Sequence, residues 1–265
     1  MKYFKYWVKE PFHITIDGKS ERIDILSGSN VSSQDASDQA QACSRQIEDR
    51  IQHGGRKDDD YETPIKEYVD DIIDDANVIT ICRYGAKILN TNQYTVLDLD
   101  DYPIDFMDIF KSVRKLPKKE RIVHKFLQRI KKYPEIGSDF RIYETAKGIR
   151  VIGKTYIDPS MRSFQSFMRK FAVDWIYIAM CKKQNCYRAR LTPKPYRMRF
   201  KTIKVKSPLD CEQQPYLDWQ KDYHNESGKF SVVKLVQSVG NDFSYEPVIK
   251  LHDEMCGAVC GRRLA

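Results

Sequence analysis

Short apolar runs of strand length follow one another in the middle of the chain, and they constrain the fold more than any other feature. Residues 78–82, 87–90 and 94–100 are rich in valine, isoleucine, leucine and tyrosine, and typical turn residues separate them. Residues 140–144 and 149–152 indicate a further hairpin around a turn of small residues. These runs predict neighbouring strands of a sheet.

Helical patterns alternate irregularly with the strands. Ser32 or Ser33 is expected to cap a helix that ends near His53, just before Gly54 and Gly55. The other predicted helices are residues 63–75, 117–133 and 161–180, and the other predicted strands are residues 187–191, 230–236 and 248–251. This mixture predicts the α+β class.

Three parts of the chain are distinguished by these patterns. Residues 1–57 form an N-terminal appendage, in which a hairpin at residues 13–27 turns at Asp17-Gly18 and precedes the first helix. Residues 58–206 form the central region, which contains the candidate site residues discussed below. Residues 207–265 are expected to contribute strands that complete the domain.

Length and composition exclude several classes of protein. A chain of 265 residues can bury a substantial core, and its 41% hydrophobic and 12% aromatic content excludes disordered and fibrous proteins. No apolar run approaches the ~20 residues needed to cross a bilayer, and the polar start lacks a signal-peptide core. We therefore expect a soluble, cytoplasmic protein without a membrane partner.

The seven cysteines are an odd number in a chain too large to need disulfide cross-links, which favours reduced thiols. The residues considered for a zinc site are Cys181, Cys186, His252, Cys256 and Cys260. Their two groups lie far apart in the chain, and the spacing within them departs from common zinc motifs. Zinc is therefore not expected.

Charge is segregated along the chain, whose formal net charge is +8. Residues 58–75 are acidic, and residues 111–132 are basic with Glu120 as their single acid. Residues 187–206, here called the basic segment, contain no acid, and aromatic side chains are interleaved with their lysines and arginines. Such mixtures are typical of grooves that bind single-stranded nucleic acid. A solvated charged face is the alternative for each segment.

Asp98 and Asp100 end the strand predicted for residues 94–100. Residues i and i+2 of a strand point to the same side, so the two carboxylates are expected to lie close together and to repel one another. A divalent cation relieves this repulsion, and Mg²⁺ binds through one or two carboxylates together with substrate phosphates. The alternative is a solvated strand end, or a turn in which Asp101 caps the next residues.

Two groups of basic residues suit a polyphosphate. Lys147 and Arg150 lie in and after the turn of the hairpin at residues 140–152. Arg188 and Arg190 share one face of a strand, with Lys194 just beyond them. The anionic partner of these three cations is either a nucleoside triphosphate or the acidic residues 58–75.

The order of these motifs resembles the archaeo-eukaryotic primase superfamily, particularly its primase-polymerase branch. That family combines an Asp-x-Asp metal motif, a Ser-x-His nucleotide motif, a third metal-binding acid after an apolar residue, and a later basic stretch. Val173-Asp174 and the run from Arg188 to Lys194 are similar to the last two motifs. The resemblance covers residues 80–200. The run Arg188-Ala-Arg-Leu-Thr-Pro-Lys-Pro195 also resembles a group of uncharacterised bacterial proteins.

The resemblance implies that residues 58–206 are a catalytic palm region, with a palm-like mixed or antiparallel sheet and flanking helices. It also implies metal-dependent nucleotidyl transfer on a nucleic-acid strand, DNA or RNA, with nucleoside triphosphates as substrates. By this resemblance Asp98, Asp100 and Asp174 would hold Mg²⁺ or Mn²⁺, and the nucleotide would be bound by Lys147, Arg150, Arg188, Arg190 and Lys194. The chain lacks the histidine of the second motif, and Asp174 lies in a run that can continue as helix. The alternatives are a non-catalytic nucleic-acid-binding module and a metal-dependent nuclease that uses the same acids.

Overall fold

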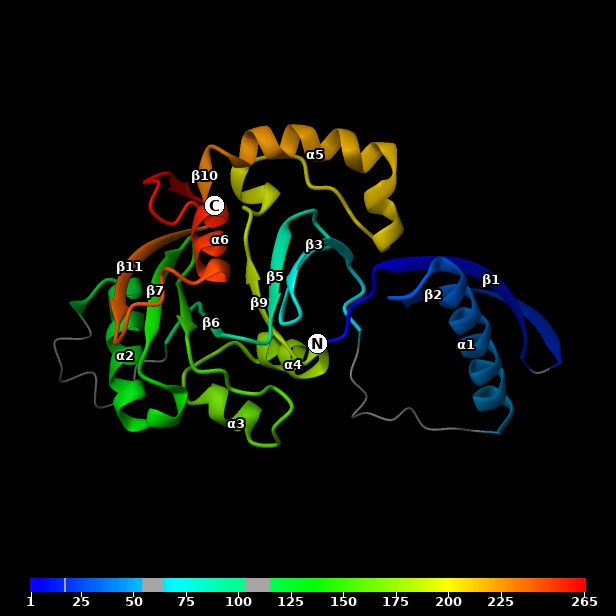
Figure 1. Ribbon diagram of the computed structural model, residues 1–265, viewed down its shortest axis with the longest axis horizontal. Coiled ribbons are helices and arrows are strands. Elements are labelled where there is room, and N and C mark those ends of the chain that lie inside the picture. Colours follow the sequence, from blue (N-terminus) through cyan, green and yellow to red (C-terminus); the bar gives the residue numbers. More distant parts are fainter. Residues whose placement is uncertain (17, 54–63, 103–114) are drawn as a thin grey trace.

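The computed structural model describes residues 1–16, 18–53, 64–102 and 115–265 (Figure 1). Helices and antiparallel sheets together confirm the predicted α+β class. Several predictions fall on residues outside these ranges. They are the turn at Asp17, the helix end at Gly54-Gly55, Pro103 as the end of the strand predicted for residues 94–100, and parts of the charged segments 58–75 and 111–132. In chain order the elements are β1 (Tyr6–Ile16), β2 (Lys19–Ser29), α1 (Ser33–His53), β3 (Tyr68–Asp74), β4 (Asn77–Ile81), β5 (Lys87–Thr91), β6 (Thr95–Leu99), α2 (Lys118–Lys132), η3 (Pro134–Ile136), β7 (Phe140–Thr145), β8 (Ile149–Gly153), α3 (Phe164–Arg169), α4 (Trp175–Gln184), β9 (Tyr187–Arg190), η4 (Pro195–Met198), η5 (Pro208–Glu212), α5 (Gln214–Ser227), β10 (Phe230–Ser231), β11 (Val233–Val239), α6 (Pro247–Cys256) and β12 (Arg263–Leu264).

Two four-stranded antiparallel sheets stand in place of the single predicted sheet. The first has the strand order β11-β7-β8-β6, and the second has the order β3-β4-β5-β9. Strands β4 to β9 lie where strands were predicted between residues 78 and 191. The prediction is confirmed because short apolar runs of this length are typical of strands that are buried on both faces. Strands β4 and β8 are buried along their whole length.

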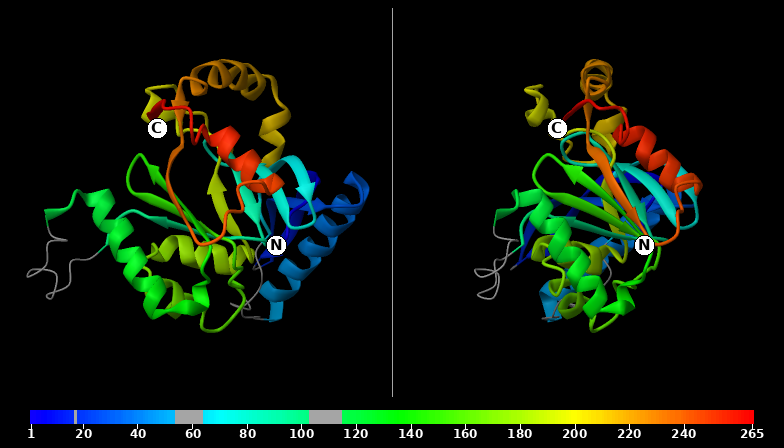
Figure 2. Two further views of the ribbon diagram at one scale, coloured as in Figure 1. Left: turned by 60° about the vertical axis from the view of Figure 1, so that its left-hand side comes forward. Right: turned by 90° about the vertical axis from the view of Figure 1, so that its left-hand side faces the viewer.

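Helices α2 and α6 cover opposite faces of the first sheet, as the two views of Figure 2 also show. Phe126 of α2 packs edge-on against Phe140 of β7, at a centroid distance of 5.3 Å. Asp253 of α6 instead contacts Tyr143, which points to the other face because side chains alternate along a strand. The face under α2 buries Phe140 and carries an ion pair between Glu144 and Lys119 of α2, whereas the face under α6 carries a network of buried charged side chains.

The N-terminal hairpin and helix form a unit that stands to one side of the sheets in Figure 1. Strands β1 and β2 pair in register from Tyr6 opposite Ser29 to Ile16 opposite Lys19. Helix α1 packs on one face of the hairpin, and Ser32 caps it by accepting a hydrogen bond from the N–H of Asp35 at 3.0 Å. The predicted hairpin and the predicted cap are confirmed.

The helix predicted for residues 63–75 is wrong, because this segment contains β3. Its β-branched residues favour a strand. Acidic side chains of the segment contact other residues of the sheet and its turns, and they do not form a solvated helix face. Asp70 forms an ion pair with Lys87 at 2.8 Å, and Asp74 accepts hydrogen bonds in the turn that leads to β4. Two register shifts interrupt the pairing of β3 with β4.

The single helix predicted for residues 161–180 is also wrong. Helix α3 ends at Arg169, and α4 begins at Trp175. Ala172 between them has a positive φ of 59°, a conformation that interrupts helical geometry. The phenylalanine spacing therefore spans two short helices, whose connection brings Asp174 to the start of α4.

The C-terminal segment adds β11 at the edge of the first sheet, beside β7. The strand predicted for residues 248–251 is wrong, because these residues lie in α6, where Pro247 occupies the first turn and Gly257 ends the helix. Helix α5 was missed, although Tyr216, Trp219 and Tyr223 have helical spacing on its buried face. No described helix is long and apolar enough to cross a membrane.

Candidate active site between the two sheets

A cavity of about 490 Å³ lies where the end of β6 and the β7–β8 turn face strand β9. It brings together every site residue predicted from the sequence except Arg150. Its walls include Glu67, Arg83, Tyr84, Asp98, Asp100, Thr145, Lys147, Asp174, Tyr177, Arg188, Arg190, Lys194 and Arg197. Acidic side chains of β6 and α4 thus share one cavity with basic side chains of β9 and the residues after it.

Gly148 allows the β7–β8 turn to approach the end of β6. A Cβ atom at position 148 would lie 2.1 Å from the backbone oxygen of Leu99 and 2.9 Å from the Cα atom of Asp100. The N–H of Gly148 donates to Thr145 Oγ1 at 3.0 Å and closes the turn. Lys147 is consequently exposed in the same cavity as Asp100.

Asp98 lies directly opposite Arg150 in the pairing of β6 with β8. Arg150 Nε donates to Asp98 Oδ1 at 2.9 Å, and Nη2 donates to Oδ2 at 3.3 Å. The Arg150 side chain is 1% exposed, whereas the Asp98 side chain is 39% exposed. Arg150 therefore holds Asp98 from behind and does not line the cavity, in contrast to its predicted contact with phosphate.

A chain of buried polar side chains continues from Arg150 to α6. Arg150 Nη1 lies 3.4 Å from His252 Nε2, and His252 Nδ1 lies 2.9 Å from Asp253 Oδ1. Asp253 also accepts hydrogen bonds from Arg141 Nη2 at 2.6 Å and from the Tyr143 hydroxyl at 2.7 Å. This network fixes the guanidinium that in turn orients Asp98.

The same arrangement determines the ionisation of Asp98. Burial alone would raise the pKa of Asp98, but the charge and hydrogen bonds of Arg150 outweigh it, helped by the charges of Arg190 and His252. The pKa of Asp98 is therefore lowered from its ordinary value, and the carboxylate is ionised at neutral pH.

Asp174 is the N-cap residue of α4. Its Oδ1 atom accepts hydrogen bonds from the N–H groups of Ile176 at 2.9 Å and Tyr177 at 3.0 Å, and its side chain is exposed in the cavity. Within residues 1–16, 18–53, 64–102 and 115–265, no three His, Cys, Asp or Glu side chains are close enough to hold a metal ion together. The three predicted acids share the cavity without forming a complete ligand set of their own.

Arg188 is paired within the protein. Its Nη2 atom lies 2.7 Å from both carboxylate oxygens of Glu67, and the two side chains are 8% and 14% exposed. The anionic partners considered for Arg188 were a nucleoside triphosphate and the acidic residues 58–75. Glu67 is one of these acidic residues, so Arg188 is paired with the second of the two. Tyr177 supports the same strand, because its hydroxyl accepts from the N–H of Arg188 at 3.3 Å.

Arg190, two residues further along β9, is not paired with any acidic side chain that the structure describes. Its Nη1 atom lies 3.4 Å from the carbonyl oxygen of Thr192 and 3.5 Å from a backbone oxygen of Ala265. Burial and the charge of Arg150 lower the pKa of Arg190, and burial and the charge of Arg190 lower the pKa of Lys194. A bound anion would relieve this accumulation of positive charge.

The residues considered for zinc are separated in the fold. Cys181 and Cys186 are buried at the end of α4, His252 and Cys256 are buried in α6, and Cys260 is exposed. All seven cysteines are free thiols, as their number suggested.

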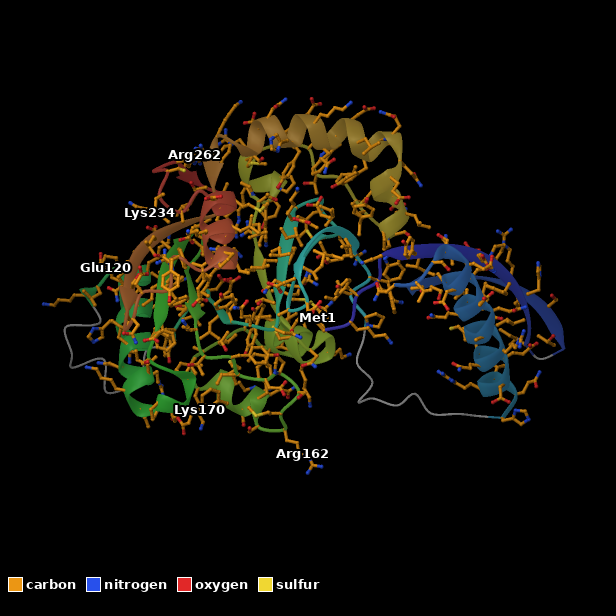
Figure 3. The ribbon with its side chains drawn as sticks, in the orientation of Figure 1. Met1, Glu120, Arg162, Lys170, Lys234 and Arg262 are labelled. Carbon is orange, nitrogen blue, oxygen red and sulfur yellow. The ribbon has the colours of Figure 1, made fainter. Side chains whose placement is uncertain are left out.

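A larger hollow of about 780 Å³ lies between α2 and β11 and contains none of the predicted site residues. Glu120 and Lys234, labelled in Figure 3, mark its two sides. In the smaller cavity, sequence reasoning missed Glu67, Arg83 and Tyr84, which no recognised motif contains. Arg197 was counted in the basic segment, but nothing in the sequence singled it out.

Neither family models nor curated proteins nor solved structures provide a match to this chain. The resemblance to primase-polymerases consequently depends on the motifs themselves. The cavity adds an independent fact, because predicted site residues from four separate parts of the chain meet in it.

Proposed function

We propose that this protein catalyses metal-dependent nucleotidyl transfer onto a nucleic-acid strand. The supporting observation is that one cavity is lined by the strand-end acids Asp98 and Asp100 and by Arg190 and Lys194, two cations without an acidic side-chain partner among the described residues. Phosphoryl transfer needs this combination, since carboxylates bind the divalent ion and cations neutralise charge that develops on the phosphates.

The donor set suits Mg²⁺ or Mn²⁺ in part. Asp98 and Asp100 offer two carboxylates from one strand end, and Mg²⁺ usually completes such a pair with water and substrate phosphates. Asp174 has already committed Oδ1 to capping α4, which leaves Oδ2 as its potential ligand atom. The site therefore fits an ion that arrives with its nucleotide better than a permanently bound one.

Each residue has a role in this proposal. Asp98, oriented by Arg150, and Asp100 bind the ion at the end of β6. Lys147, Arg190, Lys194 and Arg197 bind the triphosphate and stabilise the pyrophosphate that leaves when the 3′-oxygen forms its bond to the α-phosphorus. A bound divalent ion would lower the pKa of the attacking 3′-hydroxyl. Arg188, neutralised by Glu67, supports the strand and does not bind phosphate.

A non-catalytic nucleic-acid-binding module is the second candidate function. The Asp98–Arg150 ion pair favours it, because a carboxylate that is already paired binds a cation less strongly. In that case the cavity would bind phosphate through Arg190 and Lys194, and Asp98 and Asp100 would have only a structural role.

The decisive variant is Asp100→Asn, which removes an exposed carboxylate without breaking the Asp98–Arg150 pair. The matched control is Asp101→Asn, because Asp101 is the next residue, carries the same charge and does not line the cavity. The assay follows extension of a labelled primer on a template, with ribo- or deoxyribonucleotides and Mg²⁺ or Mn²⁺. We expect the wild type and Asp101→Asn to extend the primer and Asp100→Asn to lose at least 100-fold in rate, about 2.7 kcal/mol.

Other outcomes would replace the proposal. Wild-type protein that binds the primer-template but incorporates nothing with either metal would support the binding module. Shortening of the primer without added nucleotides, lost in Asp100→Asn, would support a nuclease. Equal loss of extension in both variants would mean that the charge of the region matters, and not the position of Asp100.

A further inference from the structure

Two large aromatic side chains are exposed beside the cavity. The Trp175 residue is 66% exposed and Tyr196 is 58% exposed, although rings of this size usually bury most of their surface. Each is a sequence neighbour of cavity-lining residues: Trp175 follows Asp174, and Tyr196 lies between Lys194 and Arg197.

The first turn of α4 fixes the place of Trp175. The cap at Asp174 starts the helix, and the Tyr177 hydroxyl lies 3.0 Å from the carbonyl oxygen of Val96 in β6. This turn is therefore anchored to the strand that ends in Asp98 and Asp100. Trp175 and its neighbour Ile176, 59% exposed, project from the anchored turn into solvent.

Tyr196 lies on the short helix η4, beyond the other end of β9 from α4. Lys194 Nζ and the Arg197 guanidinium carbon lie 5.9 and 6.0 Å from the centre of its ring. The other aromatic residues of the basic segment are not available, since Tyr187 is buried and Phe200 packs against Trp219 and Tyr223. Tyr196 is thus the exposed ring among the cations of this segment.

Positive charge continues beyond Tyr196. Four further cations follow it on the surface without an acidic partner in the described parts of the chain: Arg199, Lys201, Lys204 and Lys206. They follow Arg190 and Lys194 in the basic segment, whose first cations line the cavity. An anion with regular charge spacing and flat apolar groups matches this surface, which is the chemistry of single-stranded nucleic acid.

We propose that Trp175 and Tyr196 are stacking platforms for the bases of a single strand that crosses the cavity mouth, with its phosphates on the basic segment. This inference rests on the proposed function, because it places the strand beside the acids that would act on it. It also assigns a function to Trp175, which no sequence motif indicated.

The experiment measures binding of a 12-residue oligothymidine in EDTA and without nucleotides, so that it is independent of catalysis. Trp7 and Trp219 are each 9% exposed, and Trp175 therefore supplies the fluorescence that a stacked base quenches. We expect quenching in the wild type and its loss in Trp175→Phe. Base stacking is worth about 1–3 kcal/mol per base, so Trp175→Ala and Tyr196→Ala should each weaken binding about 5- to 150-fold.

Two controls isolate stacking from charge. Tyr245→Ala removes a 62% exposed tyrosine next to Glu246, at the opposite end of β6, and should change affinity less than twofold. An abasic 12-residue strand has the same phosphates and should bind the wild type as weakly as oligothymidine binds the double variant Trp175→Ala/Tyr196→Ala. Equal wild-type affinity for both strands, or an equal effect of Tyr245→Ala, would overturn the proposal. Failure of primer extension with stacking intact would overturn the proposed function alone.

Discussion

The arginines in and behind the cavity differ in their partners. Arg150 and Arg188 are almost fully buried and each forms an ion pair, with Asp98 and Glu67 respectively. Arg190 contacts Arg150, because its carbonyl oxygen accepts from Arg150 Nη1 at 2.8 Å, yet it has no acidic side chain as a partner within the described residues. Arg190 is also the least buried of the three, because its side chain is partly exposed. The three arginines therefore differ both in burial and in the presence of an acidic partner.

This difference indicates which charges belong to the fold and which are available to a ligand. A buried cation that is paired in the protein gains nothing from an added anion and is destabilised when its partner is lost. An unpaired cation repels its neighbours, and an anion stabilises it. The contrast can be tested by removing one arginine of each kind.

The largest effect is expected for Arg150→Met, which leaves Asp98 without its cation and breaks the contact with His252. Loss of one partner from a fully buried pair costs about 3–5 kcal/mol, and the partial exposure of Asp98 reduces this to about 2–3 kcal/mol. Urea unfolding at pH 7 measures the loss. The control Arg199→Met removes an exposed arginine that has no acidic partner in the described part of the chain, and it should change stability by less than ~0.5 kcal/mol.

The same pair of proteins should differ less in acid. The pKa of Asp98 is lowered in the folded state, so its ionisation stabilises the fold above the ordinary value of 3.8, and this contribution is lost as the pH falls through the lowered pKa. The stability difference between wild type and Arg150→Met is therefore constant from pH 7 to about pH 5 and shrinks below 3.8. A difference that stayed constant down to pH 2 would mean that packing, and not charge, is what Arg150 provides.

Much of the cavity could be predicted from local patterns. The strand ending in Asp98-Leu99-Asp100 and the turn at Lys147 follow from short apolar runs and turn residues, which act within a few positions of the chain. Asp174 was found by its similarity to a family motif, but its place at a helix start depends on the break at Ala172.

The pairing of the arginines could not be predicted, because it depends on which strands become neighbours. Arg150 meets Asp98 since β8 lies beside β6, and Arg188 meets Glu67 across 121 positions of sequence. Arg188 and Arg190 have the same residue type on the same strand face, so no local signal separates the paired residue from the unpaired one. The misassigned helix at residues 63–75 also hid the strand that follows Glu67.

An intermediate effect is expected for Arg190→Met, which keeps the volume of the side chain but removes its charge. Inorganic triphosphate should bind about 10- to 150-fold more weakly, the equivalent of a charge-assisted hydrogen bond of ~1.5–3 kcal/mol. The melting temperature should stay the same or rise, since repulsion from Arg150 and Lys194 is relieved. Isothermal calorimetry and a thermal scan measure the two quantities.

Arg188→Met should give the reverse pattern, which is lower stability with unchanged triphosphate affinity. Identical behaviour of both variants would remove the distinction between the two arginines.

The smallest effect concerns the salt dependence of strand binding. A plot of log binding constant against log salt concentration has a slope of about −0.7 per phosphate contact for single strands. Roughly four to five contacts along the basic segment therefore predict a slope of about −3. Replacing Lys201, exposed and without an acidic partner in the described residues, with alanine should make the slope shallower by about 0.7. Lys87→Ala is the matched control, because Lys87 is already paired with Asp70 at 2.8 Å and has no counterions of its own to release. Binding titrations of oligothymidine between 50 and 200 mM salt, a range over which such slopes are well resolved, compare the two variants. Equal slopes for both would mean that paired and unpaired cations contact the strand alike, and the contrast between the two kinds of basic residue would then be confined to the cavity.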